Sequence, residues 1–390
     1  MSKNFIPYGK HEITKSDIDC VTKILKNENL TQGSIVPKFE KKICSRVSST
    51  YCIAVNSATS ALHLACKALD LGLNDYLWTS PISFVASANC GLYCGAKVDF
   101  VDIDPSTGLI SIESLKKKLI ISEKTKRLPK ILVVVHLAGT SCNMEEIYKL
   151  SNKYGFEIIE DASHAIGGEF NDFPVGSCKY SKVTVFSFHP VKIITTGEGG
   201  ACTTNDEKVF KKISLLRSHG IEKNPNLFEL TPKGPWSYEQ QILGFNYRLT
   251  DIQAALGINQ LKRLDKIIVK RNKILNLYNN LLKDLPVNLL KVPDNVKSSV
   301  HLVIIRLFDS SPKVHKYVFE KMRKNNIGIQ LHYSPIHLQP YYRKLGFNPG
   351  DFPEAEKYGL NSFSIPVFTK LKEKDQCRIV NTLKNILEDI

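Results

Sequence analysis

A chain of 390 residues with 43% hydrophobic and 23% charged side chains has the composition of an ordinary globular protein and is long enough for about two or three domains. Its formal net charge of +15 would suit a nucleic-acid-binding protein, but the densest basic stretch, 114–130, reads as the end of a helix and a loop. Neither a helix-turn-helix, a zinc finger nor an aromatic-basic signature accompanies it. We therefore expect a lysine-rich surface that attracts anionic ligands, and no nucleic-acid partner.

Membrane and metal-binding classes are also disfavoured. Residues 1–13 contain no apolar signal core, and the longest aliphatic run, 131–135, is far too short to span a bilayer. The ten cysteines are scattered; only Cys90 and Cys94 lie close together, and no second pair completes a zinc site. Scattered cysteines in a long chain suggest a reducing compartment. We expect a cytoplasmic protein with no membrane partner and no metal.

In chain order, short apolar segments alternate with helical patterns from about residue 50 to 205. Helical spacing of apolar residues occurs in 59–70, 83–94 and 144–155. The predicted strands are 52–57, 77–80, 97–104, 130–139, 156–164, 183–187 and 201–204. Such alternation predicts an α/β fold with a mostly parallel sheet that is covered by helices on both faces.

The last third of the chain has a different pattern. A long helical region, 251–283, is followed by a strand-like segment, 299–308, and by helices near 312–324 and 372–388. These elements predict a smaller α+β domain. We therefore divide the chain into a large domain, 1–260, which includes the N-terminal segment, and a small C-terminal domain, 261–390.

Several polar residues follow predicted strands, where open α/β sheets bind their ligands. Asp161 ends one strand, Ser187 ends another, and Lys192 follows five residues later. Thr59 and Ser60 open a helix, whose free N–H groups and dipole attract an anion.

Taken singly, each of these residues has an ordinary structural explanation. Thr59 and Ser60 would more often be a plain helix N-cap. Asp161 could simply cap a strand end, whereas Phe84 and His164 could belong to the core. The glycine-rich segment 195–200 precedes a strand rather than opening a helix, so it is weak evidence for dinucleotide binding.

Taken together, a phosphate site, an aromatic ring, a strand-end carboxylate and a lysine are the groups that pyridoxal 5′-phosphate requires. A lysine amine forms a Schiff base with the cofactor aldehyde. A carboxylate keeps the ring nitrogen protonated, which makes the ring an electron sink. An aromatic side chain stacks on the pyridine face.

The chain closely resembles the DegT/DnrJ/StrS sugar aminotransferases over nearly its whole length. The resemblance implies fold type I of the pyridoxal-phosphate enzymes, with a mostly parallel seven-stranded sheet in a large domain and a smaller C-terminal α+β domain. The eight ordered motifs that carry it are 56–62, 80–89, 95–105, 135–139, 160–168, 186–200, 216–221 and 244–257.

The resemblance also implies roles for individual residues. Lys192 would form the Schiff base, Asp161 would pair with the ring nitrogen, and His164 would contact the ring hydroxyl; these three are the expected catalytic residues. Phe84 would stack on the ring. The expected phosphate-binding residues are Ala58, Thr59, Ser60, Ser187 and, from the neighbouring subunit, Asn246. A homodimer with active sites at the subunit interface is therefore expected. Ala58 stands where the family usually has glycine, and alanine is tolerated unless the position needs a positive φ.

Within the family, segments 7–14, 30–33, 187–192 and 332–347 most resemble members that transfer the amino group of L-glutamate to a UDP-linked 4-keto-6-deoxy sugar, releasing 2-oxoglutarate. The expected substrate-binding residues are Tyr8, His189, His219, Arg248, His332 and Tyr333.

Three alternatives remain open. One is a deoxygenating dehydratase of the same fold, although such enzymes resemble this family with histidine in place of the Schiff-base lysine. Another is a 4- or 3-aminotransferase acting on a dTDP- or GDP-linked sugar. The third, a non-catalytic cofactor-binding regulator, predicts an appended DNA-binding segment or a broken site, and neither is visible in the sequence.

Overall fold

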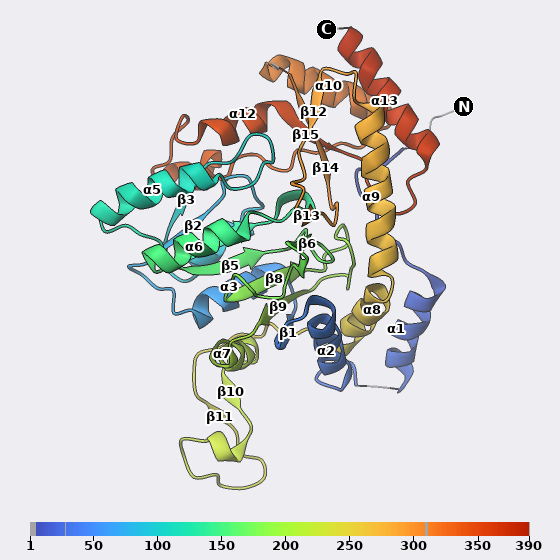
Figure 1. Ribbon diagram of the computed structural model, residues 1–390. Coiled ribbons are helices and arrows are strands. Elements are labelled where there is room, and N and C mark those ends of the chain that lie inside the picture. Colours follow the sequence, from blue (N-terminus) through green and yellow to red (C-terminus); the bar gives the residue numbers. More distant parts are fainter. Residues whose placement is uncertain (1–4, 28, 309–310, 390) are drawn as a thin grey trace.

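The computed structural model describes residues 5–27, 29–308 and 311–389, so residues 1–4 of the expected N-terminal segment lie outside it. A seven-stranded sheet crosses the body of the molecule (Figure 1) in the order β1-β9-β8-β5-β4-β2-β3. Its strands are β1 (Tyr51–Val55), β2 (Tyr76–Thr79), β3 (Lys97–Phe100), β4 (Ile131–Val135), β5 (Glu157–Asp161), β8 (Val183–Ser187) and β9 (Gly200–Thr204). Within this sheet, β9 runs in the direction opposite to the other six strands. The predicted mostly parallel sheet is confirmed.

Alternating side chains of each strand enter two hydrophobic cores, one on each face of the sheet. In β4, for example, Ile131 and Val133 enter one core, whereas Leu132 and Val134 enter the other. The first face is covered by α3 (Ala58–Ala68), α4 (Ala86–Tyr93) and α7 (Glu207–Arg217). The opposite face is covered by α2 (Ile35–Val47), α5 (Ile112–Lys124), α6 (Met144–Tyr154), α8 (Asp251–Leu261) and the first part of α9 (Leu264–Leu281).

The C-terminal part contains a three-stranded antiparallel sheet in the order β12-β14-β15. Its elements are β12 (Val287–Leu289), β14 (Val303–Leu307), α10 (Pro312–Lys324), α11 (Pro340–Lys344), α12 (Pro353–Asn361), β15 (Ser362–Ile365) and α13 (Glu373–Glu388). Packing crosses the expected division of the chain, because Ile6 belongs to this C-terminal core and Tyr358 belongs to a core of the large sheet. The boundary at 260/261 stays a prediction.

Other elements carry the connections. The helix α1 (Lys15–Asn27) packs beside α8, and a small sheet joins β6 (Glu169–Phe170), β7 (Phe173–Pro174) and β13 (Val296–Lys297). The hairpin of β10 (Ile221–Glu222) and β11 (Glu239–Gln240) projects away from the body in Figure 1. Among the described residues, every helix is too short or too polar to cross a membrane.

Candidate active site

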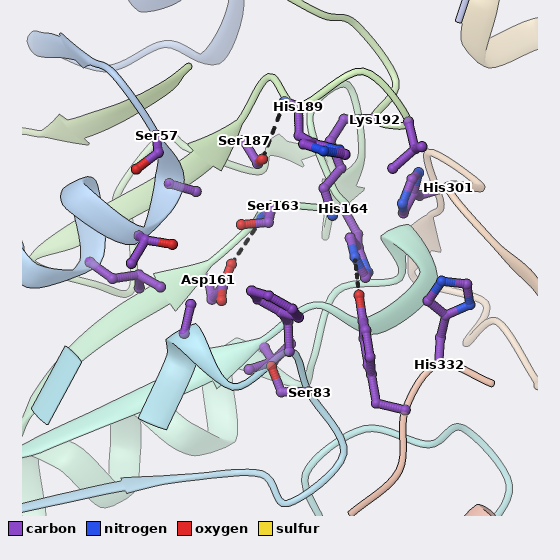
Figure 2. A pocket seen from close by; sticks show the side chains of 18 of the residues that line it. Ser57, Ser83, Asp161, Ser163, His164, Ser187, His189, Lys192, His301 and His332 are labelled. Atoms are coloured by element: carbon purple, nitrogen blue, oxygen red, sulfur yellow. Dashed lines mark hydrogen bonds between the residues drawn. The ribbon is translucent and has the colours of Figure 1, made fainter. Parts of the chain in front are cut away.

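A cavity of about 670 Å³ opens where β5 and β8 end and α3 begins, and its size suits a small organic ligand (Figure 2). Twelve of the predicted site residues line it: Tyr8, Ala58, Thr59, Ser60, Phe84, Asp161, His164, Ser187, His189, Lys192, His332 and Tyr333. The other three, His219, Asn246 and Arg248, do not.

Asp161 is the last residue of β5, and its side chain is buried at the edge of the sheet. The Ser87 hydroxyl donates to its Oδ2 at 2.6 Å, and the backbone N–H of Ser163 donates to its Oδ1 at 3.1 Å. Ser87 Oγ in turn lies 2.7 Å from Ser83 Oγ. These hydrogen bonds hold the carboxylate in one orientation at the cavity wall.

Lys192 lies in the turn that follows β8, where its backbone N–H donates to the carbonyl of His189 at 2.9 Å. Burial lowers the pKa of the Lys192 amine to about 8, and the negative charge of Asp161 acts in the opposite direction. A lysine with a lowered pKa has more neutral amine near neutral pH, and only the neutral amine is a nucleophile. Lys192 therefore differs chemically from the solvated lysines of the surface.

The start of α3 forms a second wall of the cavity. Ser57 is the N-cap in extended conformation, and its hydroxyl accepts from the backbone N–H of Ser60 at 3.1 Å. Ala58 is the first helical residue and is not among the residues with positive φ, so alanine fits where the family usually has glycine. The remaining free N–H groups of the first turn favour an anion at this end.

Close packing brings β9 against this helix start. A Cβ on Gly200, the first residue of β9, would lie 2.6 Å from the backbone nitrogen of Ala58, so glycine is needed there. Gly200 is also the ladder partner of both Val55 and Ser187. The Ser187 hydroxyl at the end of β8 is therefore held close to the start of α3.

His164 and Tyr333 form a third wall, built from both parts of the chain. The Tyr333 hydroxyl lies 3.2 Å from His164 Nε2 (Figure 2). Burial lowers the pKa of His164 well below its usual value, and the charges of Lys192 and His332 add to this effect. Burial and the charge of Lys192 likewise lower the pKa of His332 to about 4.

Several lining residues were not predicted from the sequence: Asn56, Ser57, Leu62, Ser83, Ala86, Val135, Ser163, Val191, Glu198 and His301. Ser57 had a usable signal, since serine before a helical pattern is a typical N-cap. His301 had none, because it comes from the C-terminal part of the chain and reaches the cavity only through tertiary packing.

The three predicted residues outside the cavity lie together at the base of the β10–β11 hairpin. Arg248 forms an isolated bridge with Val55, and Asn246 forms one with Ser218, next to His219. Asn246 and His219 are exposed. Their roles, and the contribution of Asn246 to a neighbouring subunit, stay predictions.

Comparison with known proteins agrees with the geometry of the site. The model of the DegT/DnrJ/EryC1/StrS aminotransferase family matches residues 11–384. The chain belongs to this family. It is a sugar aminotransferase, and it uses pyridoxal 5′-phosphate.

Relatives of this aminotransferase match over their full lengths. The UDP-4-amino-4,6-dideoxy-N-acetyl-beta-L-altrosamine transaminase of Campylobacter jejuni is 40% identical over 99% of this chain and 98% of its own. Among solved structures, Helicobacter pylori PseC, described as an aminotransferase of pseudoaminic acid biosynthesis, has a TM-score of 0.90 at 32% identity, over 99% of this chain and 100% of that one. The PLP form of the putative sugar aminotransferase Spr1654 from Streptococcus pneumoniae also reaches 0.90, at 27% identity over 99% of both chains.

The cavity of this aminotransferase fits the cofactor. The ring of Phe84 is 59% exposed at the cavity although such rings are usually buried, and a stacked pyridine would cover it. His164 Nδ1 is buried and has no hydrogen-bond partner among the described residues. An unpaired buried nitrogen of this kind is costly unless a ligand or water satisfies it.

Proposed function

We propose that this aminotransferase moves the amino group of L-glutamate to C4 of UDP-2-acetamido-2,6-dideoxy-β-L-arabino-hexos-4-ulose. The products are 2-oxoglutarate and UDP-4-amino-4,6-dideoxy-N-acetyl-β-L-altrosamine, a step of pseudaminic acid biosynthesis. The observation that carries the proposal is a half-buried Lys192 whose amine has a lowered pKa and is influenced by the charge of Asp161, in a chain 40% identical to the Campylobacter jejuni transaminase of that name.

Each wall of the cavity has a place in this proposal. When bound, pyridoxal 5′-phosphate supplies an aldehyde that captures the amine and a ring that accepts electrons. Asp161, held by Ser87, would pair with the ring nitrogen, and Phe84 would stack on the ring. Ala58, Thr59, Ser60 and Ser187, which line the cavity near the start of α3, would hold the phosphate.

Lys192 is both the covalent attachment point and the proton carrier. Its amine takes a proton from Cα of glutamate in the first half-reaction and delivers one to C4 of the sugar in the second. A pKa of about 8 suits both tasks, because efficient general acid–base groups titrate near the operating pH. His164 stays neutral and holds the ring hydroxyl.

The sugar nucleotide lies at the cavity mouth. Tyr8, His189, His332 and Tyr333 line the cavity and would offer hydroxyl and imidazole groups to it. We place Asn246, Arg248 and His219 in the active site of a second subunit, with Asn246 on the cofactor phosphate and Arg248 available to an anion such as the donor carboxylate. The protein acts in the cytoplasm as a homodimer.

A panel of keto sugar nucleotides tests the substrate. Purified protein loaded with cofactor is treated with glutamate, which should bleach its visible absorption band. Addition of the UDP-linked 4-keto sugar should restore the band, and mass spectrometry should detect the amino sugar. Recovery only with a dTDP- or GDP-linked keto sugar would favour the alternative 4- or 3-aminotransferase. No bleaching by any amino donor would favour a non-catalytic regulator.

A further inference from the structure

We propose that His301 is a positioning residue of the active site that fixes the ring of His164 beside Lys192. This role rests on the proposed functions of Lys192 and His164. His301 lines the cavity next to His164 and Lys192 (Figure 2), although it belongs to the C-terminal part of the chain.

The segment that carries His301 docks on the turn η1 (Leu137–Gly139) after β4. The backbone N–H of His301 donates to the carbonyl of Ala138 at 2.8 Å, and that of Ser299 donates to the carbonyl of Gly139 at 3.0 Å. The Ser299 hydroxyl donates to the backbone carbonyl of His164 at 2.7 Å. One short segment therefore contacts both the turn and the backbone of His164.

Gly139 makes this docking possible. Its φ is +94°, and a Cβ there would lie 2.4 Å from Ser299 Oγ and 3.0 Å from the backbone nitrogen of His301. A side chain at this position would be strained by its φ and would also push the docked segment away. The close approach of the two segments depends on glycine.

Arg271 of α9 holds the same segment through its backbone carbonyls. Its Nη1 donates to the carbonyl of Val300 at 3.0 Å and to that of His301 at 3.4 Å. Arg271 is buried, so its guanidinium depends on these carbonyls for hydrogen bonds. Because η1 binds its N–H and Arg271 binds its carbonyl, the backbone of His301 has little freedom, and its ring contacts that of His164.

The two imidazole rings are in contact. Their centroids lie 4.3 Å apart with the planes tilted by 43°. The Nδ1 atoms of both rings are buried and have no hydrogen-bond partner in the part of the chain that the structure describes. The charged or titratable groups that face the pair are Lys192, Arg271, His332 and Tyr333.

Burial and the positive charge of Lys192 favour the neutral form of both rings. Burial lowers the pKa of His301 well below its usual value, and the positive charges of Lys192 and Arg271 lower it further. Positive charge on His164 would lower the pKa of the Lys192 amine further, whereas a neutral His164 leaves that pKa where burial and Asp161 set it. Without the ring of His301, water can enter behind His164, and the imidazole can turn and protonate more easily.

The test uses His301→Asn and His301→Gln, with His337→Asn as a matched control. His337 is also fully buried, but it pairs with Glu356 and lies outside the cavity. We expect both His301 variants to shift the pH midpoint of the visible band of the cofactor-loaded protein by about one unit, the usual spread of pKa values among folded-protein environments. We also expect about tenfold weaker cofactor binding in apoprotein titrations. The control should change neither quantity.

A purely structural role gives a different result. If the His301 variants lower the midpoint of thermal unfolding as His337→Asn does, but keep the wild-type spectral midpoint and cofactor affinity, the proposal is wrong. If the variants do not fold, ¹⁵N NMR of the histidine side chains in the wild-type protein tests the proposal through the protonation state of His164. His164 should then stay neutral well below pH 6, and titration near 6.5, the ordinary value for histidine, would contradict the proposal. None of these measurements uses the sugar substrate. Failure of the proposal for His301 can therefore be distinguished from failure of the substrate assignment.

Discussion

Lys192 lies where burial and a nearby carboxylate act on its amine in opposite directions, and burial has the larger effect. In the apoprotein, the neutral amine should predominate above about pH 8 rather than above 10.5. We therefore expect the rate at which apoprotein captures pyridoxal 5′-phosphate to rise with pH and to be half-maximal near pH 8. Stopped-flow absorbance across pH 6–11 measures it. A rate still rising steeply at pH 10 would place Lys192 in an ordinary solvated environment.

The same shift has a consequence for stability. Because the unfolded chain keeps the Lys192 proton up to a higher pH than the folded apoprotein does, the unfolded state binds more protons between about pH 8 and 10.5. This residue therefore contributes an increase in the free energy of unfolding as pH rises through that window. Urea unfolding of wild type and Lys192→Met at pH 7 and pH 10 measures this contribution. The free energy of unfolding of the variant, relative to that of wild type, should be smaller at pH 10 than at pH 7. An unchanged difference would contradict the shift.

Substitution of Lys192 should affect chemistry far more than folding. In Lys192→Ala we expect both half-reactions to fall by at least about 10²–10⁴-fold, the range that a positioned acid–base group contributes. Substitution of an exposed lysine of the surface, Lys124→Ala, should leave turnover unchanged. Bleaching by glutamate measures the first half-reaction. Persisting turnover in Lys192→Ala would exclude this lysine as the proton carrier.

At the scale of elements, the contact between β9 and the start of α3 sets the phosphate site. In Gly200→Ala, a methyl group would meet the backbone of Ser57 and Ala58, which should cost about 1–3 kcal/mol of unfolding free energy. The shift of α3 should also weaken cofactor binding, measured by absorbance titration of apoprotein. Gly72→Ala is the control, since a Cβ there would come no closer than 3.9 Å to Asp75 Oδ2, an ordinary contact distance. Unchanged cofactor affinity in Gly200→Ala would show that the position of the start of α3 does not determine phosphate binding.

The elements with strong local signals were predictable from the sequence. Examples are β4, with five consecutive apolar residues, and α6, with apolar residues at helical spacing. Each begins within about two residues of its predicted start. The helical region 251–283 consists of two helices, α8 and α9, that are separated at Lys262 and Arg263. Neither glycine nor proline marks that break. The two-residue strands β10 and β11 likewise have no periodicity long enough to detect.

At the scale of the whole molecule, the site was predictable only in part. Asp161, Ser187 and Lys192 follow strands of one sheet, so their convergence follows from the topology. His301 lies more than a hundred residues further along and reaches the cavity because Gly139 and Arg271 admit and hold its segment. Such contacts depend on tertiary packing, which single-sequence patterns do not encode.

The projecting β10–β11 hairpin bears directly on assembly. Leu230 and Trp236 in the hairpin and Leu243 just after it are 75%, 76% and 82% exposed, and these apolar side chains would suit contact with a second subunit. We expect a dimer in sedimentation experiments. Mixing Lys192→Ala with Asn246→Ala subunits should restore activity, because one of the two sites in each mixed dimer would then be intact. No restoration would mean that Asn246 does not act across the interface.

The most direct test of the central claim is to trap the cofactor on its lysine. The cofactor-loaded protein is reduced with borohydride, digested, and mapped by tandem mass spectrometry. A reduced pyridoxyl group on Lys192, with the other lysines unmodified, is the predicted result. A stoichiometric adduct on another lysine, with Lys192 unmodified, would contradict it.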